Sequence, residues 1–111
     1  GRLGVWTEVK AATEETQDIC DMLKSQAEAK WTKQSYQIFK AIEYRVQPVA
    51  GTNFLIKVHV GGNEYLHIYA FQSPLQEGQI KTLLEGQIKT LLKRVEKHKE
   101  GDPLEPIKPW D

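Results

Sequence analysis

The stretch FLIKVHVGGNEYLHIYAF, residues 54–71, decides the fold of this chain. Apolar side chains occupy every second position of its first part, at Phe54, Ile56, Val58 and Val60. After Gly61-Gly62-Asn63, a second alternating run extends from Glu64 to Phe71. A period of two residues is typical of a half-buried strand, and Gly-Gly-Asn suits the positive φ angles of a tight turn. The stretch therefore predicts an antiparallel β-hairpin with one face turned to a core.

An earlier strand is expected over residues 36–46. Positions of one parity carry large apolar or aromatic side chains, namely Tyr36, Ile38, Ile42, Tyr44 and Val46. Polar side chains fall on the other parity, and Lys40 interrupts the alternation, which favours a β-bulge or a bend near that residue. Together the three alternating runs predict an antiparallel meander.

The segment before these strands, residues 13–31, is expected to form a helix that covers the sheet. Its apolar side chains recur three and four residues apart, at Ile19, Met22, Leu23, Ala27 and Trp31. Thr13 is a suitable N-cap, and Glu14 and Glu15 place negative charge in the first turn, where the helix dipole favours it. The patterns therefore predict an α+β domain, with one helix packed on an antiparallel sheet.

A perfect duplication follows Ser73-Pro74, because EGQIKTLL at 77–84 recurs at 85–92. Two copies of this length are too few and too short to be stacked repeats, which favours a local insertion. Its apolar positions fit a helical stripe, but an even-numbered insertion in a strand would also keep later side chains on their faces. Both conformations stay open. The proline-rich residues 101–111 predict an irregular tail.

The composition is that of one domain spanning residues 1–111, with 15 basic and 15 acidic side chains. Nucleic-acid binders usually carry a basic excess, so we expect no nucleic-acid partner. No run approaches the roughly 20 apolar residues that span a bilayer, and the N-terminal region lacks the apolar core of a signal peptide. We therefore expect no association with a membrane.

Cys20 is the one cysteine of the chain, and there is no Asn-x-Ser/Thr glycosylation sequon. Both features favour a reducing compartment, and we expect a cytoplasmic protein, with nuclear entry as a further option. Cys20 lies about two turns inside the predicted helix without an activating motif beside it, so we expect a buried structural thiol.

We find no residue set for catalysis, a metal ion or a cofactor. His59 and His67 fall on neighbouring strands, but two histidines without a third ligand at matching spacing make a poor metal site. We expect both to face solvent and His98 to belong to a charged face. The sequence therefore predicts no metal, no cofactor and no enzymatic activity.

The segment Gln47-Pro48-Val49-Ala50-Gly51 lies between two predicted strands. Proline and glycine are ordinary turn residues, so a plain hairpin loop is one interpretation. Val49 and Ala50, however, are apolar at the expected tip of the loop, and exposed apolar residues on a short stiff loop suit insertion into a partner's groove.

This segment resembles the Gln-x-Val-x-Gly loop of the cystatins, and Thr52-Asn53-Phe54 with IKVHVG at 56–61 resembles the strand that follows it in the stefins, or type 1 cystatins. Further stefin-like segments lie in the same order: Ala12-Thr13, Glu15-Thr16-Gln17, Ile19, Phe39-Lys40-Ala41, His67 and Phe71-Gln72-Ser73. The likeness covers about residues 4–73. It implies a cystatin-like fold, with one long α-helix packed on a four- to five-stranded antiparallel β-sheet.

The resemblance implies a reversible, tight-binding inhibitor of papain-like cysteine proteases of the cathepsin type. In that family, three segments form a wedge that blocks the active-site cleft. Carried over to this chain, they are the N-terminal trunk at Leu3-Gly4, the loop of Gln47, Pro48, Val49, Ala50 and Gly51, and a second hairpin loop at Pro74-Leu75. Leu3 would occupy an apolar substrate subsite, and Gly4 would let the backbone turn away from the catalytic centre.

Three features depart from the stefin pattern. Pro48 stiffens the first loop and either preorganises or spoils it. Pro74-Leu75 reverses the usual order of Leu and Pro, and the duplication falls just behind this pair. Without one copy, the remainder aligns with the last stefin strand, which places the extra residues in the second hairpin. The alternative function is a binding or scaffold protein that keeps the cystatin fold without inhibiting proteases.

A monomer is the expected assembly. The resemblance to stefins also implies an alternative, a domain-swapped dimer in which two chains exchange the helix and its adjoining strand around a hinge at residues 47–51. Such a dimer would straighten the first loop and lose the wedge.

Overall fold

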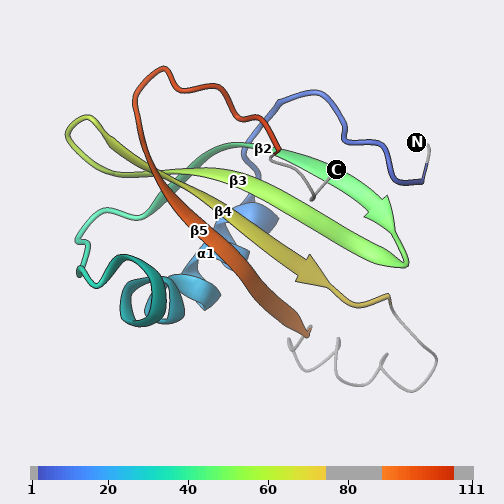
Figure 1. The fold of residues 1–111 in the computed structure, drawn as a ribbon, viewed down its shortest axis with the longest axis horizontal. Coiled ribbons are helices and arrows are strands. Elements are labelled where there is room, and N and C mark those ends of the chain that lie inside the picture. The colour runs from blue at the N-terminus through green and yellow to red at the C-terminus, as the bar shows by residue number, and fades with distance from the viewer. Residues whose placement is uncertain (1–2, 75–88, 107–111) are drawn as a thin grey trace.

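The computed structural model describes residues 3–74 and 89–106. Their strands form one five-stranded antiparallel sheet in which each strand pairs with the next along the chain. In chain order, the elements are β1 (Lys10–Ala11), α1 (Glu14–Gln26), the π-helical turn η1 (Ala27–Thr32), β2 (Lys40–Val49), β3 (Gly51–Gly61), β4 (Glu64–Gln72) and β5 (Thr90–Lys99). Helix α1 lies across one face of the sheet (Figure 1), so the predicted helix-on-sheet architecture is confirmed.

Helix α1 begins at the predicted cap. Thr13 Oγ1 accepts the Thr16 N–H at 3.2 Å, and Thr16 Oγ1 accepts the Thr13 N–H at 2.8 Å, so the two threonines form a capping box. The helix buries Thr16, Ile19, Cys20 and Leu23. Met22 is about half exposed, which corrects the predicted stripe, because it lies roughly a third of a turn from the centre of this face.

At the end of the helix a second residue of the predicted apolar stripe, Trp31, is not in the core. After Ala27 the backbone widens into η1, where the Lys33 N–H donates to the Glu28 carbonyl, five residues back, at 2.9 Å. A wider turn needs five residues rather than four to return to the same face. Thr32 is therefore only 7% exposed, whereas Trp31, the predicted core residue, is 43% exposed.

Strand β2 begins at Lys40, later than predicted, and contains the expected bulge. Its register against β3 shifts between Ala41 and Glu43. Because a bulge reverses the alternation of side chains, the strand residues next to it have the opposite parity from the prediction, whereas Tyr36, which precedes the strand, packs against the core as predicted. The structure buries Phe39 and Ala41 and exposes Ile38 and Ile42. Beyond the bulge, Tyr44 and Val46 pack against the core as predicted.

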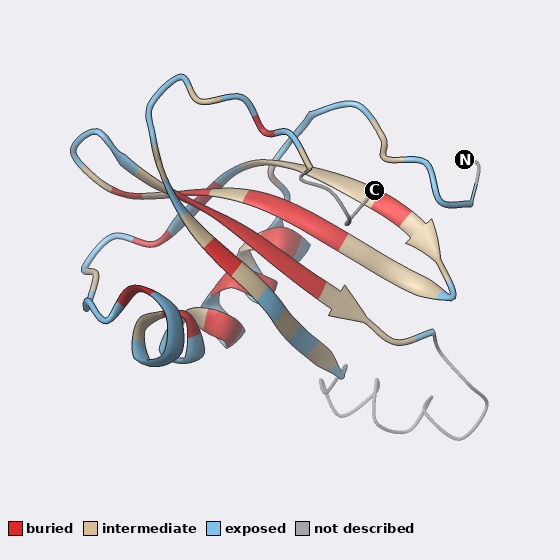
Figure 2. Cartoon of the chain, viewed as in Figure 1, coloured by how far each residue is buried: buried red, intermediate tan, exposed pale blue. Residues whose placement is uncertain are grey.

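Long parts of β3 and β4 are buried (Figure 2), and the buried side chains lie on both faces of the hairpin. The face toward α1 holds the main core, with Phe54, Ile56, Val58, Val60, Leu66, Ile68, Ala70 and Val95. A smaller cluster of Leu55, Tyr69 and Leu104 forms on the other face, where Trp6 packs against it. The N-terminal segment and the tail therefore cover part of the face that the helix leaves open.

Strand β5 contains the end of the duplicated segment. Residues 90–92 pair with Gln72, Phe71 and Ala70 of β4, so this part is a strand. Residues 77–88 of the duplication lie outside the described residues. Between Lys99 and residue 106, the last described residue of the tail, the structure has no helix or strand. In the described parts of the chain, no helix has the length and apolar character needed to span a membrane.

Candidate functional site

Three segments expected to bind a partner lie at one end of the sheet (Figure 1). They are the N-terminal residues from Leu3, the turn between β2 and β3, and Ser73-Pro74 at the end of β4. The register explains why they meet, because Pro48 of β2 pairs with Thr52 of β3, and Thr52 pairs with Gln72 of β4. The segments thus stand side by side in the order of the strands that carry them.

The turn between β2 and β3 is tighter than the predicted five-residue loop. Gln47, Pro48 and Val49 belong to β2 and Gly51 to β3, so Ala50 alone lies between the strands. The Val49 side chain is half-buried and Ala50 is exposed. Pro48 is accommodated within the paired part of the hairpin, where φ near −65° and a missing N–H are tolerated toward a strand end.

Gly51 joins this turn to the end of β4. Its φ of +117° is one that side chains other than glycine rarely adopt. A Cβ atom at this position would lie 2.5 Å from the Gln72 carbonyl oxygen and 2.7 Å from Cζ of the Phe71 ring. Only glycine therefore lets β3 leave the turn so close to the strand that leads to Pro74.

The trunk is held against β2 by its backbone. The Gly4 N–H donates to the Pro48 carbonyl at 2.6 Å, and the Thr7 N–H donates to the Val46 carbonyl at 2.8 Å. Gly4 has φ of +77°, so the chain bends at this residue. Leu3, just before the bend, is 77% exposed. An apolar side chain is thus presented to solvent directly beside the β2–β3 turn.

Gln47 connects the trunk to the turn from inside the molecule. It is only 4% exposed, and its Nε2 donates to the Gly4 carbonyl at 3.1 Å. Its Oε1 accepts from Asn53 Nδ2 of β3 at 2.8 Å. Both ends of this amide are satisfied within the chain, so Gln47 fixes the position of Gly4 relative to the hairpin.

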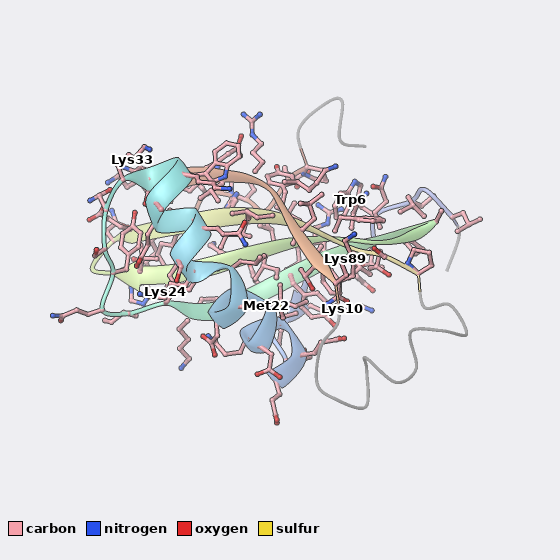
Figure 3. The ribbon with its side chains drawn as sticks, turned by 90° about the horizontal axis from the view of Figure 1, so that it is seen from below. Trp6, Lys10, Met22, Lys24, Lys33 and Lys89 are labelled. Atoms are coloured by element: carbon pink, nitrogen blue, oxygen red, sulfur yellow. The ribbon has the colours of Figure 1, made fainter. Side chains whose placement is uncertain are left out.

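Further anchoring residues were missed by the sequence analysis. Arg45 donates to the Thr7 carbonyl at 2.8 Å and to the Leu104 carbonyl at 3.0 Å, and so holds the trunk and the tail together. Trp6 packs on the cluster that contains Leu104, and it lies toward the opposite end of the long axis from Lys33 (Figure 3). The one feature of the sequence that could have indicated this anchoring is Trp6 itself, a large aromatic residue in a stretch without helical or strand periodicity.

Of the second hairpin loop, the described residues include Pro74 and not Leu75. Pro74 is exposed, two residues after the end of β4. The expected contact at Leu75 lies outside the described residues, as does the first copy of the duplication.

Two of the remaining candidates for chemistry, Cys20 and His67, are buried, whereas His59 and His98 are partly exposed. Cys20 is buried as predicted, and burial, with a smaller contribution from Asp21, raises the pKa of its thiol to about 12. His67 corrects the expectation of a solvent-facing residue, because it is only 1% exposed and its ring stacks on that of His98. Burial, followed by the nearby charges of His98 and Lys57, lowers the pKa of His67 to about 4.

Comparison with known proteins shows which family this sequence is similar to. The family model described as Cystatin domain matches residues 4–93. The chain is 53% identical over 81 residues to leukocyte cysteine proteinase inhibitor 1 of Sus scrofa, a match that covers 72% of this chain and 78% of the relative. It is 56% identical over 70 residues to cystatin-A8 of Sus scrofa, covering 63% and 67% of the two chains. Human cystatin-B is 44% identical over 80 residues, covering 72% and 81%.

Proposed function

The chain belongs to the cystatin family, and on that premise we propose that it inhibits cysteine proteases of the papain type. The relative at 53% identity is named as an inhibitor of cysteine proteinases, and others are named as cystatins. The chain is therefore an inhibitor rather than an enzyme. A scaffold role without inhibition, the alternative drawn from the sequence, has less support than this function.

The arrangement of the trunk and the first turn is the observation that carries the proposed mechanism. Leu3, Ala50 and Pro74 expose apolar surface at one end of the molecule, and Val49, next to Ala50 in the chain, is half-buried. The hydrogen bonds from Gly4 to Pro48 and from Gln47 to Gly4 fix the first two segments before any partner binds. A preorganised apolar edge loses little conformational entropy on binding, which favours high affinity from a small contact area.

We propose that this edge is a wedge that contacts the active-site cleft of the protease. Its described residues are Leu3, Gly4, Pro48, Val49, Ala50, Gly51 and Pro74, and the resemblance to stefins adds Leu75. Gln47 is buried, so its part is to position Gly4 and the turn. Leu3 suits an apolar subsite of the enzyme, and the bend at Gly4 turns the chain away before a peptide bond reaches the nucleophile. Inhibition therefore leaves the inhibitor uncut.

We also propose the class of target enzyme, the assembly state of the inhibitor and its cellular compartment. Apolar Leu3 favours enzymes of the cathepsin type whose cleft has an apolar subsite beside the catalytic cysteine. The active species is a monomer, because the tight turn at Ala50 exists only when β2 and β3 of one chain pair with each other. The cytoplasm is the proposed compartment, on the strength of the single buried thiol.

A titration of active papain with the purified monomer tests this function. We expect competitive inhibition of a fluorogenic substrate with a dissociation constant on the order of nanomolar. Mass spectrometry after prolonged incubation should find the inhibitor intact. The absence of inhibition by a folded monomer at micromolar concentration, or cleavage near Gly4 or Ala50 in step with the loss of inhibition, would contradict the proposal.

A further inference from the structure

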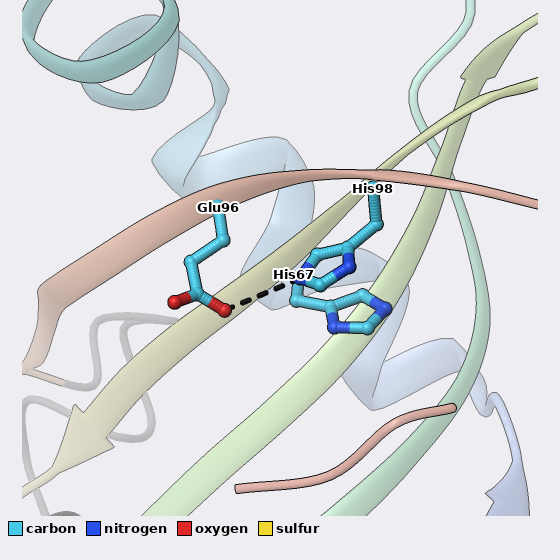
Figure 4. A group of neighbouring side chains, drawn as sticks. All are labelled: His67, Glu96 and His98. Atoms are coloured by element: carbon cyan, nitrogen blue, oxygen red, sulfur yellow. Dashed lines mark hydrogen bonds and ion pairs between the residues drawn. The ribbon is translucent and has the colours of Figure 1, made fainter. Parts of the chain in front are cut away.

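A histidine and carboxylate cluster lies on β4 and β5, on the face of the sheet that the helix does not cover (Figure 4). His67 of β4 is paired with Glu96 of β5, and Tyr65 is paired with His98. Side chains two residues apart on a strand share a face, so Glu96 and His98 both lie beside His67. One nitrogen of each histidine and one oxygen of Glu96 all lie within 4.8 Å of one another.

His67 is the buried member of the cluster. Its Nε2 atom is buried and, within the part of the chain that the structure describes, has no hydrogen-bond partner. A polar atom buried without a partner costs about 1–3 kcal/mol, so a native protein seldom leaves one unsatisfied without a function.

Neighbouring charges orient the other two members. Nδ1 of His98 lies 2.8 Å from Oδ2 of Asp102, and the Lys99 N–H also donates to this oxygen at 3.0 Å. With its Nδ1 proton donated to Asp102, His98 presents Nε2 toward Glu96 Oε1, at 3.3 Å. Arg94 binds the second oxygen of Glu96, with Nε and Nη2 each at 3.0 Å from Oε2. Such outer contacts are typical of metal sites, where carboxylates fix the ligating histidines.

We propose that one ring nitrogen of His67, together with His98 Nε2 and Glu96 Oε1, binds a divalent transition metal ion, with Zn²⁺ as the ion that suits them best. Two imidazoles and one carboxylate form a donor set that Zn²⁺ accepts, and a water molecule would complete a tetrahedral shell. Mg²⁺ and Ca²⁺ prefer oxygen ligands, so they should not bind here.

Binding requires a small rearrangement of the cluster. The two imidazole rings stack at 3.7 Å between centroids, with an angle of 17° between their planes, and nitrogen lone pairs lie in those planes. One ring must therefore turn before both can reach the same ion. His98 is the ring that can turn, since its side chain is partly exposed whereas His67 is buried, and the partly exposed side chain of Asp102 has room to follow it. Ligands about 2.0–2.1 Å from Zn²⁺ lie about 3.3 Å apart, so the cluster must also contract.

The bound ion would join β4 to β5 and, through the contact of His98 with Asp102, to the chain that follows. The cluster lies toward the Glu64 end of β4, whereas the wedge lies at the Gln72 end. Zn²⁺ should therefore tighten the last strand without covering the wedge, and the inhibition constant for papain should be the same with and without the ion.

Isothermal titration of untagged, EDTA-treated protein with ZnCl₂ tests the site, with MgCl₂ as the ion control. We compare the wild type with His98→Gln and Glu96→Gln, which change partly exposed side chains. Glu96→Gln keeps the shape of the side chain, and His98→Gln removes the imidazole but keeps a neutral polar group. His59→Gln is the matched control, because His59 is a histidine of the same sheet outside the cluster. Circular dichroism confirms that each variant is folded.

We expect one Zn²⁺ per chain with a dissociation constant on the order of micromolar. Each cluster variant should weaken binding by at least about 10- to 100-fold, and His59→Gln by less than about two-fold. Zn²⁺ should raise the melting temperature of the wild type and of His59→Gln and leave that of His98→Gln unchanged. No binding at about 1 mM Zn²⁺, wild-type affinity in His98→Gln, or an equal loss in His59→Gln would each overturn the proposal.

Discussion

Gly51 is the residue on which the shape of the first turn depends. We expect Gly51→Ala to destabilise the fold by about 2–4 kcal/mol, since a strained positive φ and the overpacking against Phe71 and Gln72 each cost roughly 1–3 kcal/mol. Urea denaturation followed by circular dichroism measures this difference. Gly62→Ala is the control, because its Cβ would meet open space at a φ of +55°, and it should cost only about 1 kcal/mol. Equal losses for both variants would show that contact with β4 does not constrain the turn.

Gln47 is predicted to act on the protease through the trunk. Gln47→Ala removes the bond to the Gly4 carbonyl, so we expect it to weaken inhibition by about ten-fold, or about 1.4 kcal/mol. In a protein lacking residues 1–4 the same substitution should have a clearly smaller effect, because the group that it positions is absent. Inhibition constants of the four proteins form a double-mutant cycle. Additive effects would mean that Gln47 does not position the trunk.

The sequence predicted single residues well where one local rule decides them. Thr13 caps the helix and Cys20 is buried, both as expected. His67 was wrongly expected to face solvent, because the strand pattern shows that it lies opposite the helix but not that His98 and the chain beyond it cover that face. The alternation of residues within one strand does not predict its contacts with distant segments of the chain.

Among the elements, the hairpin at 54–71 and the helix were predicted with the correct type of secondary structure. The wrongly placed side chains lie where one extra residue interrupts the regular period of a strand or a helix. The bulge before Glu43 reversed the faces of Ile38 and Ile42, and the π-helical turn replaced Trp31 with Thr32 in the core. Both irregularities insert one residue into a period, and a pattern read with a fixed period cannot place the insertion.

The packing of α1 on the sheet makes stability depend on pH through Cys20. The thiol has a pKa of about 12 in the folded chain against 9.0 for the free group. Between these values the unfolded chain has lost a proton that the folded chain keeps, so the unfolding free energy falls as pH rises above 9, by up to about 1.4 kcal/mol per pH unit. Cys20→Ala should lack this part of the decline.

Urea denaturation of the wild type and Cys20→Ala at pH 8, 9 and 10 measures the two slopes. The substitution lowers stability at every pH because it leaves a cavity, but it should give a shallower decline above pH 9. Parallel curves for the two proteins would show that the thiol does not titrate as described.

At the scale of the whole molecule, the three segments of the wedge were assigned from the resemblance, and the chain's own pattern contributed the apolar turn at 49–50. The trunk could not be placed from local sequence. Its position depends on bonds from Arg45 and Gln47 to Thr7 and Gly4, which join residues about forty positions apart. A periodic pattern carries no information on such pairs, whereas family resemblance does.

The assembly state should control activity, if the chain exchanges its helix and adjoining strand. In a swapped dimer the turn at Ala50 would open into a continuous strand, so Val49 and Ala50 would no longer form a tip beside Gly4. We expect the dimer fraction from size-exclusion chromatography to be inactive against papain and the monomer fraction to inhibit it. Equal potency per chain in both fractions would exclude this control.

The proposed inhibition requires the apolar turn beside the trunk to enter the protease cleft. The most direct test is the inhibition constant of Val49→Asp for papain, measured beside Val9→Asp, which makes the same change at an exposed valine away from the wedge. We expect Val49→Asp to weaken inhibition by at least about 100-fold, because it places a charge in a desolvated contact, and Val9→Asp to change it by less than about three-fold. A folded Val49→Asp variant that inhibits as well as the wild type would contradict the account.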